Sequence, residues 1–532
     1  MPASFDVIVI GSGFGGAVTA CRLAEKGDKV LILERGRRWE TNDYPRDLND
    51  AWIYDSKEPH KQNGWLDFRY FGDMAVMTGA GVGGGSLIYA NVSIEAKPWL
   101  FEKGWPPEIT YTELQPYYER VGKMLDVQTI PDNQLTKRFL LMKEGAEKLG
   151  YSERFQKLPL AVTFDNNWGY DLEDPFNDKH TKKFTNAHGQ QQGTCVHCGN
   201  CIIGCQVKAK NTLDLNYIPL AQKHGAEVRP LHVVRYIEPE KTGSENGGYR
   251  VHFDRIESGK ARRGSETARR VIVAAGSIGS TELLLRCRDQ YKTLPKLSQR
   301  LGYNWSSNGD FLTPAFYTDR EASPTEGPTI SSAIDFLDGG VGHQRFFIED
   351  GGFPNVLRNF VEEYRKNPPK HPILHAIMAG LIPLLRTEDP LGNAMPWFAQ
   401  GIDAADGRLY LGRPWYAFWR KKELQMKWRI KESEPVIEAI INMHKRLSAA
   451  TGGAPWAPPT WTIFKNLTTP HPLGGCNMGT DENTGVVNHR GEVFGYPNLF
   501  VADGAIVPEA IGLNPSRTIA ALAERIADLI PG

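Results

Sequence analysis

The chain begins with two short apolar runs separated by a helical pattern. Residues 5–10 (FDVIVI) are almost entirely apolar and rich in β-branched side chains, which is typical of a strand covered on both faces. Residues 17–27 (AVTACRLAEKG) place apolar side chains at roughly helical spacing and end at a glycine, and residues 29–33 (KVLIL) form a second strand-like run. The pattern predicts a strand, a helix and a second strand.

Glycines and one acid occupy the turns of this unit. Gly11, Gly13 and Gly16 follow the first run with G-x-G-x-x-G spacing, and Glu34 ends the second run. The first glycine permits a tight turn, the second lets a pyrophosphate approach the backbone, and the third lets helix and strand pack closely. Glu34 can accept hydrogen bonds from the ribose hydroxyls of an adenosine. The unit therefore predicts a dinucleotide site, although it does not tell which dinucleotide binds.

Strand patterns of the same kind recur far along the chain. Residues 271–275 form a strand-like run before a helical pattern at 276–285 (GSIGSTELLL), and residues 498–504 (NLFVADG) form another. The segments between them are rich in Trp, Tyr, Phe and Pro, with a helical pattern at 435–450. This interleaving predicts an α/β fold, in which a doubly wound Rossmann-type domain packs on an α+β substrate domain with a mainly antiparallel sheet. The expected bounds are 1–100, 195–305 and 465–532 for the dinucleotide-binding domain, and 101–194 and 306–464 for the substrate-binding domain.

Composition excludes some classes of partner. Lys+Arg and Asp+Glu both number 62 in a chain of 532 residues, and no basic block is present, so we expect no nucleic-acid partner. The N-terminus lacks a basic segment followed by an apolar one, and no apolar run reaches about 18 residues. Seven cysteines are an odd number and do not form the framework of a small secreted fold. We therefore expect a cytoplasmic protein.

A second glycine-rich stretch carries a family resemblance. Residues 78–91 read TGAGVGGGSLIYAN, and glycines here free the backbone for close approach to a flat ligand. Together with residues 276–285 and the C-terminal segment 498–530, this stretch resembles the glucose-methanol-choline (GMC) family of flavoproteins, and is most similar to its cholesterol oxidase branch with a cysteine-rich insert. The residues that match the family's flavin-binding pattern are Gly84, Gly85, Ser86 and Asn91.

The resemblance implies FAD as the dinucleotide, with its ring system buried between the two domains. It also implies that Asp503 and Gly504 lie beside the ribityl chain. His471, held between two prolines in TTPHPLGG, matches the family's catalytic histidine, and Asn514 matches its second catalytic residue. An unperturbed histidine has a pKa of about 6.5, which suits a group that takes a proton from an alcohol.

These features predict an FAD-dependent oxidoreductase that oxidises a CH–OH group by hydride transfer to the flavin, with O₂ or another acceptor reoxidising the cofactor. Two other functions fit the same pattern: a flavin-containing lyase without redox chemistry, and an electron-transfer flavoprotein. Cholesterol oxidases also use a glutamate on the substrate-facing sheet. Glu388 lies in the corresponding third of the chain, but its neighbours do not match, so steroid isomerisation is in doubt.

An apolar concentration bears on the substrate. Residues 373–385, with Met395, Trp397 and Phe398, suit a small-molecule alcohol that is bulky and apolar, such as a 3β-hydroxysteroid or a long-chain alcohol. The same residues fit simple core packing equally well. If exposed, they suit a peripheral membrane contact.

Four cysteines crowd into eleven residues. Cys195, Cys198, Cys201 and Cys205 have C-x2-C-x2-C-x3-C spacing, which is similar to that of a bacterial ferredoxin. Three assignments fit: ligands of an Fe-S cluster that relays electrons from the flavin, a structural zinc site or disulfide staple, and four free thiols.

Overall fold

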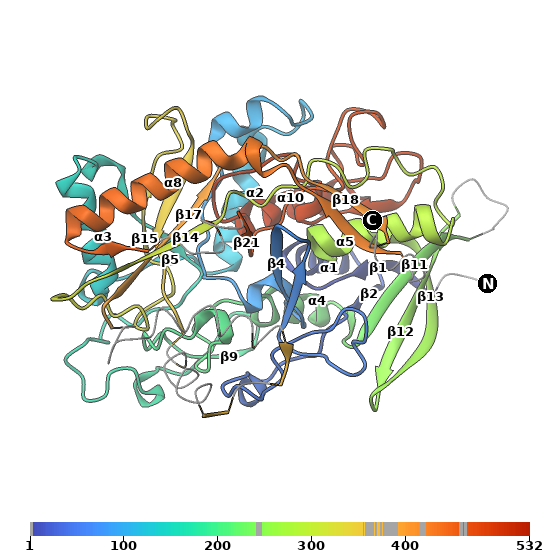
Figure 1. Ribbon diagram of the computed structural model, residues 1–532. Coiled ribbons are helices and arrows are strands. Elements are labelled where there is room, and N and C mark those ends of the chain that lie inside the picture. Colours follow the sequence, from blue (N-terminus) through green and yellow to red (C-terminus); the bar gives the residue numbers. More distant parts are fainter. Residues whose placement is uncertain are drawn as a thin grey trace.

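The computed structural model describes residues 4–240, 247–354, 392–413, 422–456 and 465–531, together with residues 356, 366, 367, 370–372, 375 and 461. Its two largest sheets lie toward opposite ends of the molecule (Figure 1). The seven-stranded sheet lies at the end of the molecule where the N-terminus is found, and the six-stranded sheet lies at the opposite end of the molecule. The predicted fold class, α/β with a doubly wound domain and a second domain with an antiparallel sheet, is confirmed.

The seven-stranded sheet has the parallel centre that the sequence predicts. Its order is β10-β2-β1-β13-β12-β11, and β22 pairs with the end of β13. The strands β1, β2, β10, β13 and β22 run parallel, whereas β11 and β12 add an antiparallel edge. The bounds are β1 (Phe5–Ile10), β2 (Val30–Leu33), β10 (Glu227–Arg229), β11 (His232–Pro239), β12 (Tyr249–Glu257), β13 (Lys260–Val273) and β22 (Leu499–Val501).

Helix α1 (Phe14–Glu25) connects β1 to β2 and lies against the sheet because Gly16 has no side chain. A Cβ at Gly16 would lie 2.0 Å from the carbonyl oxygen of Gly11. Helix α10 (Ser516–Leu529) packs on α1, as does α4 (Tyr217–Lys223). The helix α2 (Tyr111–Met124) covers α10 in turn. The C-terminal helix is thus held inside the dinucleotide-binding half.

The six-stranded sheet is antiparallel throughout, with the order β20-β14-β17-β16-β15-β6. Helix α8 (Ile430–Thr451) lies along it and contacts β14, β16 and β17, and α3 (Lys137–Lys148) packs on α8 (Figure 1). The bounds are β6 (Phe155–Lys157), β14 (Phe311–Phe316), β15 (Ser332–Asp335), β16 (Phe346–Asp350), β17 (Ala394–Gly401) and β20 (Ala454–Pro455). All of these strands come from the two ranges assigned to the substrate-binding domain; the domain bounds themselves stay a prediction.

Shorter strands and helices join the two sheets. A three-stranded sheet of β21 (Leu467–Thr469), β4 (Met74–Gly79) and β3 (Leu66–Tyr70) brings the segment before His471 beside the glycine-rich stretch. Helix α5 (Gly276–Leu285) follows β13, as predicted. Among the described residues, no helix combines the length and the apolar character needed to cross a bilayer.

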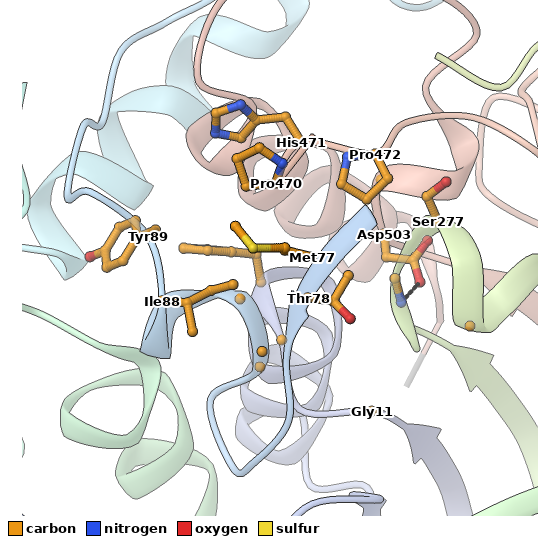
Figure 2. Close-up of a pocket in the computed structure, with 18 of the residues that line it drawn as sticks. Gly11, Met77, Thr78, Ile88, Tyr89, Ser277, Pro470, His471, Pro472 and Asp503 are labelled. Atoms are coloured by element: carbon orange, nitrogen blue, oxygen red, sulfur yellow. Dashed lines mark hydrogen bonds between the residues drawn. The ribbon is translucent and has the colours of Figure 1, made fainter. Parts of the chain in front are cut away.

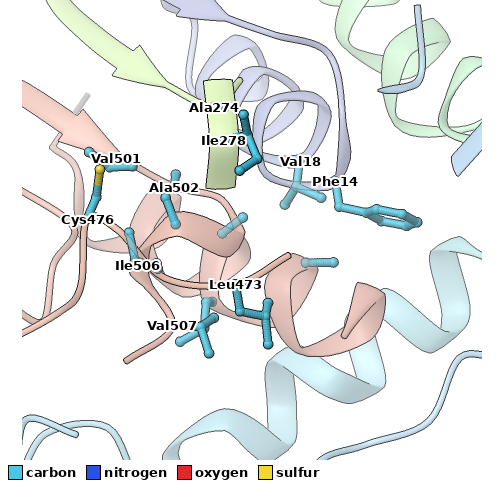
Figure 3. Packing of buried hydrophobic residues seen from close by; sticks show 14 of the residues in the cluster. Phe14, Val18, Ala274, Ile278, Leu473, Cys476, Val501, Ala502, Ile506 and Val507 are labelled. Atoms are coloured by element: carbon cyan, nitrogen blue, oxygen red, sulfur yellow. The ribbon is translucent and has the colours of Figure 1, made fainter. Parts of the chain in front are cut away.

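One core cluster joins the N-terminal unit to the C-terminal segment. Phe14 and Val18 of α1, Ile278 of α5, and Leu473 and Val507 of the C-terminal segment all lie in it (Figure 3). Cys476 is fully buried in the same cluster, and its Sγ lies 3.6 Å from Oγ1 of Thr281. Cys476 is therefore a packing residue.

Candidate active site

A cavity of about 640 Å³ runs from the dinucleotide turn to His471. The first glycine turn, the end of β2, the glycine-rich stretch, the start of α5 and the C-terminal segment all line it. Of the sequence-predicted site residues, the structure places these in its wall: Gly11, Gly13, Glu34, Gly84, Gly85, His471, Asp503, Gly504 and Asn514.

At one end of the cavity, the carboxylate of Glu34 is held in place by the first turn. Oε2 accepts hydrogen bonds from Ser12 N (3.0 Å) and Ser12 Oγ (2.7 Å), and Oε1 accepts one from Gly36 N (2.9 Å). Only 4% of Glu34 is exposed. A buried carboxylate at the carboxyl end of the second parallel strand has the position in which dinucleotide folds hold the adenosine ribose.

Three predicted flavin-site residues, Gly16, Ser86 and Asn91, are outside the wall. The role of Gly16 is the helix–strand contact described above, as the sequence predicts. Ser86 is fully buried, and its hydroxyl donates to Gly83 O (2.7 Å) and accepts from Leu213 N (3.1 Å). Ser86 thus shapes the glycine-rich turn from behind.

The glycine-rich turn faces the middle of the cavity. Figure 2 shows Met77, Ile88 and Tyr89 of this region across from Pro470 and His471. A Cβ added at Gly85 would have no atom within 4 Å, so this glycine leaves open space that a ligand can fill. Gly84 has φ +52° and approaches Gly13 so closely that a Cβ would lie 2.6 Å from the Gly13 Cα. The two glycine turns therefore pack on each other directly.

Asn91 is an unusual residue behind this wall. It is fully buried with φ +70°, and neither its amide nitrogen nor its amide oxygen has a hydrogen-bond partner among the described residues. Its neighbours Ala90 and Val92 line the cavity. An orphaned buried amide is costly unless a ligand satisfies it. Together with the open space at Gly85, the orphaned Asn91 fits the flavin that the sequence predicts.

Asp503 lines the cavity, but protein donors already occupy its carboxylate. Oδ2 accepts from Gly276 N (2.7 Å) and Ser280 Oγ (2.5 Å), and Oδ1 accepts from Ala505 N (2.8 Å). Figure 2 shows Asp503 beside Ser277 at the start of α5. Asp503 therefore fixes the start of this helix at the wall, where Gly504 also lies.

At the other end of the cavity, His471 is paired with an aspartate. Its Nδ1 lies 2.9 Å from Oδ1 of Asp310, the residue directly before β14. Burial by itself lowers the pKa of His471, but the charges of Asp310 and Glu349 outweigh that effect and hold the pKa above its usual value. Because Nδ1 is engaged, Nε2 is the nitrogen that His471 offers to a ligand.

Asn514 also lies at this end, next to a second buried acid. Its Nδ2 is 3.5 Å from Oε2 of Glu349, which also accepts a 2.8 Å hydrogen bond from Gln400 Nε2. Within the described part of the chain, Oε1 of Glu349 and Oδ1 of Asn514 have no hydrogen-bond partner. Burial raises the pKa of Glu349 to about 7.

Sequence reasoning missed both Asp310 and Glu349. Glu388, the glutamate that it considered, lies outside the described residues. The structure itself draws attention to Glu349, because all five residues of β16 (FFIED) are buried and acids are almost never fully buried without a partner. A single acid on a strand belongs to no motif with a fixed spacing. Glu349 therefore stands out only once the burial of its strand is known.

Apolar side chains share the cavity wall with His471. Phe398 lies in the cavity wall, with its ring centroid 6.2 Å from that of His471. Met395 and Trp397, predicted together with it, are fully buried in the core instead. The apolar stretch at 373–385 lies outside the described residues apart from His375. Other large apolar residues of the cavity wall include Phe311, Leu312, Ile330 and Phe353.

Cys195, Cys198, Cys201 and Cys205 are four free, partly buried thiols. In the part of the chain that the structure describes, no group of three or more His, Cys, Asp or Glu residues is arranged to hold a metal ion. Burial raises the pKa of the Cys195, Cys198 and Cys205 thiols. The arrangement thus contains no disulfide staple and lends no support to the metal assignments.

Comparison with known proteins places these features in a family. The family model for GMC oxidoreductases matches residues 406–523, and the model for NAD(P)-binding Rossmann-like domains matches residues 9–46. A cholesterol oxidase of Acinetobacter baumannii is 30% identical, over 99% of this chain and 94% of its own length. A cholesterol oxidase of Mycobacterium tuberculosis is 31% identical over 100% of this chain and 92% of its own.

More distant similarities also span nearly the whole chain. A long-chain-alcohol oxidase of Arabidopsis thaliana is 22% identical over 99% of this chain and 67% of its own length. The crystal structure of a pyridoxine 4-oxidase from Mesorbium loti superimposes with a TM-score of 0.64 at 15% identity, covering 98% of both chains. The chain therefore belongs to the GMC oxidoreductase family, whose members bind FAD, and is an FAD-dependent alcohol oxidoreductase.

Proposed function

We propose that this protein oxidises the CH–OH group of a bulky apolar alcohol, such as a 3β-hydroxysteroid or a long-chain alcohol, to the carbonyl. The observation that carries the proposal is the position of His471, a residue able to take a proton, in a cavity wall that also contains the apolar side chains of Phe311, Leu312 and Phe398. An apolar wall favours a substrate that loses little hydration on entering.

The relatives support the same substrate class. The two similar bacterial proteins are named cholesterol oxidases, and the plant relative is named a long-chain-alcohol oxidase. Both names describe large apolar alcohols. They also favour O₂ as the electron acceptor.

The protein's own residues supply the proton chemistry. FAD, when bound, supplies the hydride acceptor for the hydrogen on the carbinol carbon. His471 takes the hydroxyl proton at Nε2 while the C–H bond breaks, so that one proton and one hydride leave the alcohol and a carbonyl remains. Asn514, on the same wall, can hydrogen-bond the substrate oxygen through its amide and hold it beside His471.

Glu349 favours a second reaction when the substrate is a steroid with a double bond at C5. Oxidation at C3 makes the C4 protons acidic because the new carbonyl stabilises the resulting enolate. A carboxylate with a pKa of about 7 can take a proton from C4 and return it to C6, which moves the double bond into conjugation without net loss or gain of atoms. Glu349 is buried 3.5 Å from Asn514, close to the proposed oxidation site.

Anaerobic mixing tests the oxidation. The purified, FAD-loaded protein is mixed with cholesterol, a long-chain primary alcohol or glucose, and bleaching of the flavin absorbance is followed. We expect bleaching by at least one of the two apolar alcohols and none by glucose. Bleaching by glucose alone, or by no alcohol in a broad panel, would contradict the proposal. Formation of a conjugated enone by the parent, and of the unconjugated ketone by Glu349→Gln, tests the second reaction.

A further inference from the structure

A turn at residues 306–310 connects the antiparallel sheet to both proposed catalytic residues. The turn precedes β14 and contains two residues with left-handed backbone, Asn308 (φ +57°) and Gly309 (φ +63°). A Cβ at Gly309 would lie 2.5 Å from the carbonyl oxygen of Gly401, so the turn sits tightly against β17. Its position relative to the sheet is therefore fixed.

Asp310, at the end of this turn, is fixed from two sides. Oδ2 accepts a 2.5 Å hydrogen bond from Thr469 Oγ1, and Oδ1 is 2.9 Å from His471 Nδ1. The backbone N–H of His471 donates to the same Thr469 hydroxyl at 2.8 Å. Only 1% of Asp310 is exposed. The two carboxylate oxygens thus have different partners, and His471 is held through both its ring and its backbone.

The other arm of the turn holds the segment before Asn514. The Asn308 side chain donates from Nδ2 to Leu513 O (2.8 Å) and accepts at Oδ1 from Ile511 N (3.0 Å) and Gly512 N (2.8 Å). The turn therefore aligns His471 and Asn514, which lie 43 residues apart in the chain, against one rigid support.

Few charges act on His471. In the described part of the chain, the titratable groups that influence its ionisation are Asp310 from the turn and Glu349 from β16, and both favour the protonated ring. Asp310 alone is within hydrogen-bond distance of the ring. Burial raises the pKa of Asp310, whereas the contacts with His471 and Thr469 oppose that rise.

We propose that Asp310 is the positioning residue for His471: its carboxylate accepts the Nδ1 proton, so that Nε2 faces the substrate with a free lone pair. Its negative charge then stabilises the imidazolium that forms when His471 takes the hydroxyl proton. This inference rests on the proposed oxidation at the same site. Asp310 itself does not touch the substrate.

The variant Asp310→Asn tests this role because it reverses one hydrogen bond. When the Thr469 hydroxyl donates to the oxygen of the new amide, the amide NH₂ faces His471. When this hydroxyl donates to Ser307 O instead, the amide oxygen faces His471 but carries no negative charge. An NH₂ donor at Nδ1 forces the proton onto Nε2, so the neutral ring no longer offers a lone pair to the alcohol. We expect anaerobic flavin reduction to slow by about a hundredfold or more, in the range typical for loss of a general base. The acid limb of the pH profile of flavin reduction, where the rate falls as His471 becomes protonated, should move to lower pH in this variant.

A matched control lies beside the turn. Asp403 is also a buried carboxylate and accepts hydrogen bonds from Ser306 Oγ (2.9 Å) and Ser307 Oγ (2.8 Å), but no hydrogen bond joins it to His471. Asp403→Asn should leave the acid limb of the profile in place. An equal movement of the limb in both variants would overturn the role assigned to Asp310.

Nitrogen NMR of protein labelled with ¹⁵N-histidine gives a readout that needs no substrate. The His471 signals are assigned by their loss in His471→Gln. We expect the neutral ring of the parent to be protonated at Nδ1, and the pKa of His471 to fall in Asp310→Asn. A parent ring protonated at Nε2 overturns the inference, and this measurement does not depend on whether the variant folds.

The two readouts separate the inference from the proposed function. Suppose that the His471 ring is protonated at Nδ1 and its pKa changes as expected, but the protein oxidises no alcohol. This result supports the pairing of Asp310 with His471 and contradicts the proposed alcohol oxidation. Suppose instead that the protein oxidises an alcohol, but Asp310→Asn changes neither the pH profile of flavin reduction nor the tautomer of His471. This result supports the proposed oxidation and contradicts the role assigned to Asp310.

Discussion

Oε2 of Glu349 accepts a 2.8 Å hydrogen bond from Nε2 of Gln400, across the paired strands β16 and β17 of the antiparallel sheet. The other carboxylate oxygen has no partner, and the side chain is fully buried. Because burial penalises the charged form, the pKa of Glu349 is raised from 4.5 to about 7. A carboxylate in this setting weakens the fold at alkaline pH, so it is a site where function competes with stability.

Glu349→Gln should stabilise the protein at pH 8 and have little effect at pH 5. The folded state holds a proton on Glu349 between about pH 4.5 and 7 that the unfolded state releases, so stability falls as pH rises through this window. The shift corresponds to about 3 kcal/mol at pH 8. Thermal unfolding midpoints at the two pH values measure the difference. Glu119→Gln, at an exposed position on α2, is the control and should show no such dependence. A gain in stability of Glu349→Gln as large at pH 5 as at pH 8 would argue against a buried, protonated acid.

Replacement of Gly85 should block the flavin without disturbing the fold. A Cβ at Gly85 meets no protein atom within 4 Å and extends into the cavity, so the position tolerates a side chain sterically when the cavity is empty. We expect Gly85→Leu to be purified with little FAD, and Gly85→Ala to retain most of it. Flavin released by denaturation, measured per chain, checks this, with circular dichroism as the control for folding. Full FAD content in Gly85→Leu would place the flavin elsewhere.

The four cysteines at 195–205 should be free thiols in the purified protein. They form no disulfide in the structure, and no three of them are arranged around a metal ion. Thiol titration after unfolding without reductant should therefore count all seven cysteines of the chain. Metal analysis of the same sample should give iron and zinc well below one atom per chain. One iron or more per chain, with visible absorbance remaining after flavin release, would instead establish a cluster.

The dinucleotide half was predictable from the sequence because its signals are local. The strand at Phe5–Ile10 is found at the predicted residues, and Gly16 makes the close contact that its place in the glycine motif predicts. His471 and Asn514 were proposed as site residues from the sequence because each lies in a family-like motif. The structure brings both to the same cavity.

The partners of the two proposed catalytic residues were not predictable in this way. Asp310 lies 161 residues from His471 in the chain, and only the pairing of the C-terminal segment with the turn before β14 brings them together. Of the apolar residues predicted near the substrate, Phe398 faces the cavity whereas Trp397 beside it faces the core. Successive side chains of a strand point to opposite faces of the sheet, which separates Phe398 from Trp397. The pattern of apolar residues alone does not tell which face lines the cavity and which faces the core.

Flavin reduction in His471→Ala tests the central claim most directly. The parent and the variant, both loaded with FAD, are mixed anaerobically with the apolar alcohol that bleaches the parent, and the rate of bleaching is measured by stopped flow. We expect retained FAD and a rate at least about a hundred times slower in the variant, because the group that takes the hydroxyl proton is lost. Bleaching at the parent rate would contradict it.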